Sequence, residues 1–159
     1  MQISYKQALI LSALASFGLL AAAFWFEIIV GLPPCNLCIW QRWPHAIIIA
    51  IAGVGLVAIK QNWMLLLIVL SAIITALFGL YHSGVEQGWW SGPSGCSNQL
   101  NSDTDISSLT TSLLEMPVVK CDEIAWSLMG ISMAGWNSIA SFAIAVFAFL
   151  CWKKLTQTH

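Results

Sequence analysis

Cys35 and Cys38 form a C-x-x-C pair, and Arg42 follows four residues after the second cysteine. Two intervening residues allow a short, often strained disulfide, and strain makes a disulfide easier to reduce and to exchange. Pro33-Pro34 precedes the pair and suits the first positions of a helix. A thiolate at a helix N-terminus is stabilised by the helix dipole and by free backbone N–H groups. The spacing therefore predicts thiol redox chemistry at the start of a helix.

Arg42 lies one turn deeper than Cys38 on the same face of that helix. Its cation would stabilise the Cys38 thiolate, or it would donate hydrogen bonds to a carbonyl oxygen of a bound acceptor. The alternative is an arginine that only extends its side chain to the lipid headgroups. The arginine at this spacing after a C-x-x-C pair favours a role in the chemistry.

Cys96 and Cys121 bracket residues 97–120 of a long polar segment. A disulfide between them could simply close this loop, or it could be a second exchangeable disulfide that faces a soluble partner. The turn-rich run 92–95 (G-P-S-G) predicts an open chain around Cys96. Four cysteines could also bind zinc, but structural zinc sites usually contain two close-set pairs, so we expect no metal.

The composition indicates that membrane spans position these cysteines. Of the 159 residues, 58% are hydrophobic and only 8% are charged, whereas roughly 25% are charged in a soluble domain. Six Lys and Arg balance seven Asp and Glu, which excludes a basic surface for nucleic acid. The length favours one domain over residues 1–159.

Four apolar runs predict an all-α membrane protein, an up-down bundle of four transmembrane helices. A bilayer core needs about 20 helical residues. The second run is too short if it starts at Pro44, so its helix should begin near Cys38. The expected spans are about 8–30, 38–59, 63–82 and 133–152, with outer loops at about 31–37 and 83–132.

The larger loop also shows a helical pattern. Its apolar residues recur at helical spacing, and Ser and Thr fill most positions between them. This pattern predicts a short amphipathic helix that lies on the outer leaflet or packs on the ends of the bundle. The apolar residues are Ile106, Leu109, Leu113 and Leu114.

Charge predicts the orientation, because cytoplasmic loops carry an excess of Lys and Arg. Both termini should then be cytoplasmic, and the four loop cysteines should face the oxidising side, where disulfides persist. Cys151 falls at the cytoplasmic end and is expected to be an inert apolar residue. A cleaved signal peptide at 21–23 is the competing interpretation, but the apolar run continues to Val30. The cations on the cytoplasmic side are Lys6, Lys60, Lys153 and Lys154, against Arg42 and Lys120 outside.

Three segments resemble the DsbB/DsbI disulfide bond formation proteins. Residues 35–42 (C-N-L-C-I-W-Q-R) resemble their C-x-L-C-x-x-x-R signature, although Gln41 stands where some members carry an acid. Residues 81–96 are similar to the segment that leads to the third cysteine of that family. Residues 121–137 resemble its fourth cysteine and the start of the last helix. The segments occur in the same order, with two cysteines in each outer loop.

The resemblance implies a role for each cysteine. Cys96 would be attacked by the reduced C-x-x-C of a periplasmic DsbA-like thiol oxidase, and Cys121 would be its bonded mate. Cys35 would exchange with Cys96. Cys38 would be the thiolate that meets a membrane quinone, either ubiquinone or menaquinone, and Arg42 would steady that quinone.

His82, Trp136 and Asn137 are further candidates for the quinone site, and for each a structural role is the alternative. The resemblance implies a quinone-dependent protein-disulfide oxidoreductase of the bacterial inner membrane, with its active cysteines in the periplasm. Two alternatives are a vitamin K epoxide reductase-like enzyme, whose C-x-x-C lies on a later helix, and a non-enzymatic scaffold whose loop is held by disulfides.

Overall fold

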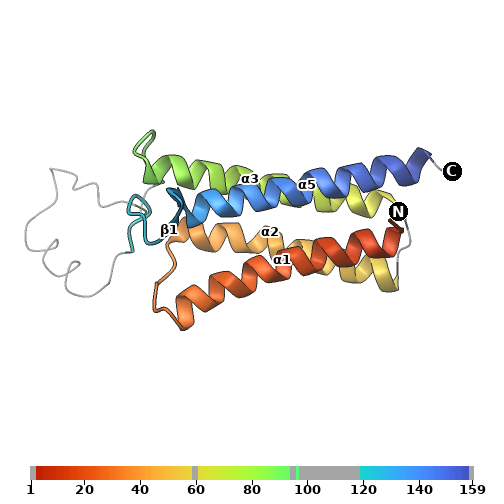
Figure 1. Ribbon diagram of the computed structural model, residues 1–159, viewed down its shortest axis with the longest axis horizontal. Coiled ribbons are helices and arrows are strands. Elements are labelled where there is room, and N and C mark those ends of the chain that lie inside the picture. The colour runs from red at the N-terminus through yellow and green to blue at the C-terminus, as the bar shows by residue number, and fades with distance from the viewer. Residues whose placement is uncertain (1–2, 59–60, 94–95, 97–118, 158–159) are drawn as a thin grey trace, which may run out of the picture.

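The computed structural model describes residues 3–58, 61–93, 96 and 119–157. Four long helices dominate this part of the chain (Figure 1), and each is long and apolar enough to cross a membrane. This confirms the predicted class of a four-helix membrane bundle. The amphipathic helix predicted around residues 106–114 lies outside the described residues. The elements are α1 (Tyr5–Ile28), α2 (Asn36–Val57), α3 (Trp63–Glu86), β1 (Ser127–Leu128), β2 (Ile131–Ser132) and α5 (Met133–Gln157).

The helices lie side by side along the long axis of the molecule, and the chain runs up and down through them (Figure 1). The start of α1 and the end of α5 lie at one end. The start of α2 and the β1–β2 hairpin lie at the other end. This order brings the C-x-x-C pair to the same end as the segment that leads into α5.

Helix α3 packs against both α2 and α5. A Cβ atom added at Gly79 would lie 2.9 Å from the carbonyl oxygen of Ala134 and 3.0 Å from the Cβ of Ser138. The missing side chain therefore lets the two helix backbones approach closely. The Ser138 hydroxyl donates a hydrogen bond of 2.8 Å to the Ala76 carbonyl across the same contact. Together these contacts fix the register of α3 against α5.

The start of α5 is set by the β1–β2 hairpin, which the sequence did not predict. Ser127 pairs with Ser132 in antiparallel register. The two turn residues, Met129 and Gly130, have φ angles of 53° and 78°, as a tight two-residue hairpin turn requires. The Trp136 indole N–H donates to the Leu128 carbonyl at 3.2 Å. The hairpin thus anchors the first turn of α5.

Among the residues that the structure describes, buried apolar side chains form two clusters. One includes Leu9, Ile48 and Leu65, and Cys151 packs in it as an apolar core residue. The other brings together Cys35, Leu37, Val85, Cys96 and Cys121. The second cluster gathers cysteines from distant parts of the sequence at one end of the bundle.

Helix α3 continues one turn past residue 82, where the apolar span was predicted to end, and reaches Glu86. Val85, in that extra turn, is 2% exposed and packs in the cysteine cluster. Its burial explains why the helix extends beyond the apolar run. The extension places Glu86 one turn after His82, on the same face of α3.

Candidate functional site

Cys35 is the N-cap residue of α2. Its sulfur accepts a hydrogen bond of 3.2 Å from the backbone N–H of Cys38. Both cysteines are free thiols, and the Cys35 thiol donates to the Cys38 sulfur across 2.8 Å. This donated hydrogen bond, together with burial, raises the pKa of Cys35 above its usual value. The C-x-x-C pair therefore lies at the helix start, with the proton held on Cys35.

Cys96 and Cys121 form a disulfide. Their exposed fractions are 1% and 0%, and they pack in the same cluster as Cys35. The disulfide removes the alternative of a zinc site made by four cysteines, because two of the thiolates are absent. The burial of Cys96 differs from the open chain that the Gly-Pro-Ser-Gly run predicted around it.

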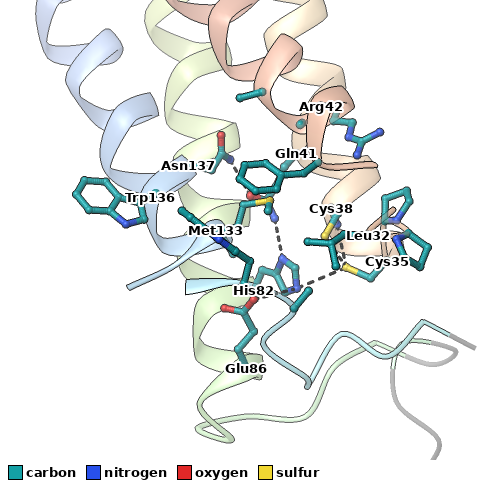
Figure 2. A pocket seen from close by; sticks show the side chains of 18 of the residues that line it. Leu32, Cys35, Cys38, Gln41, Arg42, His82, Glu86, Met133, Trp136 and Asn137 are labelled. Carbon is teal, nitrogen blue, oxygen red and sulfur yellow. Dashed lines mark hydrogen bonds and ion pairs between the residues drawn. The ribbon is translucent and has the colours of Figure 1, made fainter. Parts of the chain in front are cut away.

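His82 connects the two cysteine pairs. Its Nε2 atom lies 3.5 Å from the Cys35 sulfur, and its ring also interacts with the backbone of Cys121. Its Nδ1 atom lies 2.9 Å from Nε2 of the Gln41 amide, which can only donate. In a neutral His82 ring the proton is therefore on Nε2, the atom that faces Cys35. Figure 2 shows His82 beside Cys35 and Cys38, with Gln41 above it.

A buried polar network continues from His82 into the bundle. The Asn137 amide donates to Oε1 of Gln41 at 2.7 Å and to the Thr75 hydroxyl at 3.3 Å. Oδ1 of Asn137 lies 3.0 Å from Nε2 of His45. The network thus joins α2, α3 and α5 at the level of the cysteines and below it.

The sequence interpretation missed Gln41, His45 and Thr75 as members of this network. One signal could have found two of them, because Gln41 and His45 lie four residues apart and share a face of an apolar helix. Polar side chains inside a membrane segment are costly and usually mark a site. Thr75 carries no such pattern, since its partners come from other helices.

Arg42 pairs with Glu27 at the end of α1. Its guanidinium carbon also lies 4.9 Å from the centre of the Phe24 ring. The side chain is largely buried and lines the same cavity as Cys38. The sequence placed Arg42 near Cys38 but did not identify Glu27 as its partner. The ion pair compensates part of the cost of a buried arginine.

A cavity of about 310 Å³ opens beside the C-x-x-C pair. Its wall is mostly apolar and includes Leu19, Phe26 and Met133. The predicted site residues Cys35, Cys38, Arg42 and His82 line it, as do Trp136 and Asn137, whereas Cys96 and Cys121 do not. Glu86, which the sequence did not single out, also lines the cavity (Figure 2). A largely apolar cavity with a few converging polar groups is typical of a small-molecule site.

Comparison with known proteins gives a consistent set of relatives. Residues 5–151 match the family model described as "Disulfide bond formation protein DsbB". A protein named Disulfide bond formation protein B from Verminephrobacter eiseniae is 31% identical, over 83% of this chain and 77% of its own length. The protein of the same name from Nitrosococcus oceani is 29% identical, over 93% and 91% of the two chains. A third, from a Polaromonas strain, is 26% identical over 96% and 93%.

Proposed function

Because the chain belongs to the DsbB family of disulfide bond formation proteins, we propose that it oxidises a DsbA-like dithiol protein and passes the electrons to a membrane quinone. Family membership makes it a membrane oxidoreductase of disulfide bond formation. One observation carries the finer proposal. Cys35 packs against the Cys96–Cys121 disulfide on one side, and its neighbour Cys38 lines an apolar cavity on the other.

The first step is thiol–disulfide exchange with the partner. A thiolate of the partner attacks Cys96, and the bond to Cys121 breaks. The second thiol of the partner then closes the partner's own disulfide. Two electrons and two protons have moved from the partner to Cys96 and Cys121. Because Cys96 is 1% exposed, the cysteine cluster must open before the partner can reach it.

The second step moves the electrons inward. Cys35 exchanges with Cys96, so that Cys96 and Cys121 become a disulfide again and Cys35 and Cys38 become thiols. The structure has this distribution, with the loop pair oxidised and the C-x-x-C pair reduced. The 3.5 Å contact of His82 with Cys35 gives the departing or arriving proton of Cys35 a nearby ring nitrogen.

The cavity beside Cys38 fits a quinone headgroup. Its apolar wall suits the ring and the lipid tail, and Arg42 can donate hydrogen bonds to a carbonyl oxygen. His82 and Asn137 line the same cavity. A bound quinone supplies a two-electron, two-proton acceptor. Cys38 and Cys35 would provide these electrons and return to the disulfide form.

We further propose that the chain lies in the bacterial inner membrane with both termini in the cytoplasm. Lys6 near the start of α1 and Lys153 and Lys154 near the end of α5 lie at the same end of the bundle (Figure 1). An excess of Lys marks the cytoplasmic side. The cysteine end would then face the periplasm, where disulfides persist.

Two measurements test this function. In Cys121→Ala, a reduced DsbA-like partner should remain crosslinked to Cys96 on a non-reducing gel, whereas Cys96→Ala should give no adduct. Quinone reduction by the purified protein and the reduced partner should be lost in Cys38→Ala and retained in Cys151→Ala. A Cys38→Ala protein that still reduces quinone would contradict the proposal.

A further inference from the structure

The reduced C-x-x-C pair and His82 gather three ligand atoms that soft metal ions prefer. The sulfurs of Cys35 and Cys38 and a ring nitrogen of His82 all lie within 4.8 Å of one another. Cys35 and Cys38 lie at the start of α2, and His82 lies near the end of α3. The two helices pack against each other in the bundle. Figure 2 shows the three side chains facing one another. Two thiolates and an imidazole are common zinc ligands.

The sulfur–nitrogen distance suits a tetrahedral zinc ion, whereas the sulfur–sulfur distance is too short for one. Bonds of about 2.3 Å to sulfur and about 2.0 Å to nitrogen place a sulfur and a nitrogen ligand roughly 3.5 Å apart. The Cys35 sulfur and Nε2 of His82 are 3.5 Å apart. Two sulfur ligands should be about 3.8 Å apart, so the 2.8 Å between Cys35 and Cys38 must widen by about 1 Å. Loss of the shared hydrogen bond on deprotonation permits that movement.

Glu86 offers a fourth ligand. Its carboxylate oxygen Oε1 lies 3.9 Å from Nε2 of His82, and its side chain is 6% exposed. The other oxygen, Oε2, is buried and has no hydrogen-bond partner among the described residues. A buried carboxylate oxygen without a partner costs free energy unless a cation or a donor satisfies it. Because Glu86 lies beside His82, a cation held by the two thiolates and His82 would supply the missing partner.

We propose that the dithiol form of this protein binds one Zn²⁺ through Cys35, Cys38 and His82, with Glu86 in the fourth position. Binding releases the two thiol protons and transfers no electron. The proton on Nε2 of His82 moves to Nδ1, and the Gln41 amide turns its oxygen toward Nδ1 to accept it. The disulfide form of the C-x-x-C pair cannot bind, because its sulfurs are bonded to each other. Zinc therefore binds only the reduced dithiol form of the C-x-x-C pair and blocks its reoxidation. The site is then a reversible inhibitory site. Binding itself requires neither quinone nor the dithiol partner.

The test uses the full chain with Cys96→Ala, Cys121→Ala and Cys151→Ala, so that only two thiols remain. After reduction, this parent protein is titrated with Zn²⁺ in competition with a coloured chelator, and the released protons are measured. One zinc should bind per chain, and prior oxidation of the pair should abolish binding. Removing a ligand should weaken binding by at least about tenfold, since even outer-shell changes cost that much.

Two variants and a control locate the site. His82→Ala and Glu86→Gln should each weaken binding, whereas Gln157→Ala should leave the affinity of the parent unchanged, because Gln157 is exposed at the far end of α5. Helix content by circular dichroism verifies that each variant is folded. Unchanged affinity in His82→Ala would overturn the site, and unchanged affinity in Glu86→Gln would overturn its fourth ligand.

The wild-type protein gives the functional readout. Zinc should stop quinone reduction by the dithiol form, and a chelator should restore it. Normal turnover that zinc does not affect would overturn this inference and leave the proposed function intact. Zinc binding by a protein that never reduces quinone would overturn the proposed function alone.

Discussion

Replacing Gln41 with Glu tests how His82 acts on Cys35. The Gln41 amide donates to Nδ1 of His82 across 2.9 Å and accepts from the Asn137 amide at 2.7 Å. A carboxylate can only accept, so it keeps the contact with Asn137 and requires a proton on Nδ1 of His82. Nε2 then either accepts the Cys35 proton or, in a doubly protonated ring, faces the sulfur with a positive charge. Both outcomes favour the Cys35 thiolate.

The magnitude follows from the 3.5 Å between Nε2 and the Cys35 sulfur. A cation within about 4–6 Å lowers the pKa of an acid by about 1 to 3. The pKa of Cys35 is raised in the wild type, first by the hydrogen bond to Cys38 and then by burial, so Gln41→Glu should reverse part of that rise. Each pKa unit gives about tenfold more thiolate at a pH below the pKa.

The assay is the alkylation rate of Cys35 at several pH values, resolved from Cys38 by fragment mass spectrometry. Gln157→Glu is the control, since Gln157 is exposed at the far end of α5 and adds the same charge. An alkylation rate in Gln41→Glu that equals or falls below the wild-type rate would refute the reasoning.

Gln41→Leu should instead lower the free energy of unfolding in detergent by about 1–3 kcal/mol, because His82 Nδ1 loses its donor. Gln157→Leu should change it by less than about 0.5 kcal/mol.

Three further predictions concern packing, the proposed quinone site and pH. Gly79→Ala should lower the free energy of unfolding by about 1–3 kcal/mol through overpacking. The matched change Gly53→Ala, which meets nothing within 4 Å, should be neutral or stabilise by up to about 1 kcal/mol; equal effects would contradict the close contact. Arg42→Ala should raise the KM for quinone about tenfold or more, because a charge-assisted hydrogen bond is lost. Arg42→Lys should recover part of the quinone affinity. An unchanged KM in Arg42→Ala would argue against quinone contact. Because the pKa of Cys35 is raised, its alkylation should continue to accelerate above pH 9, and Cys38→Ala should move that rise to lower pH; a plateau at the same pH in both proteins would be the contrary result.

The sequence could predict the helices and the place of the C-x-x-C pair, because both depend on local patterns. Apolar runs of about 20 residues define the spans, and the two prolines before Cys35 favour a helix start. The helix begins at Asn36 and continues through Pro44 to Val57. The resemblance to a known family added the cysteine roles, which no local pattern supplies.

The partners of the site residues could not be read from the sequence. Cys35 and His82 are 47 positions apart, and Gln41 and Asn137 are 96 apart. Their contacts depend on how far α2 and α5 are shifted along α3. The shift of α5 is set by the close approach at Gly79 and by the hairpin before α5, and neither feature leaves a repeating signal along the chain. The pairing of Glu27 with Arg42 likewise depends on the packing of α1 against α2.

The same geometry places the Cys96–Cys121 disulfide and a largely apolar cavity at one end of the bundle. Cys35 belongs to the buried cysteine cluster and lines the cavity, and Cys38, which packs against that cluster, lines the cavity as well. His82 contacts Cys35 and is held by Gln41, so its ring orientation depends on the network that α5 completes through Asn137. A shift of α5 along α3 would therefore change the proton position at Cys35 without touching either sulfur. In this arrangement, the buried polar network links the packing of the membrane helices to the reactivity of the Cys35 thiol, which lies beside the Cys96–Cys121 disulfide.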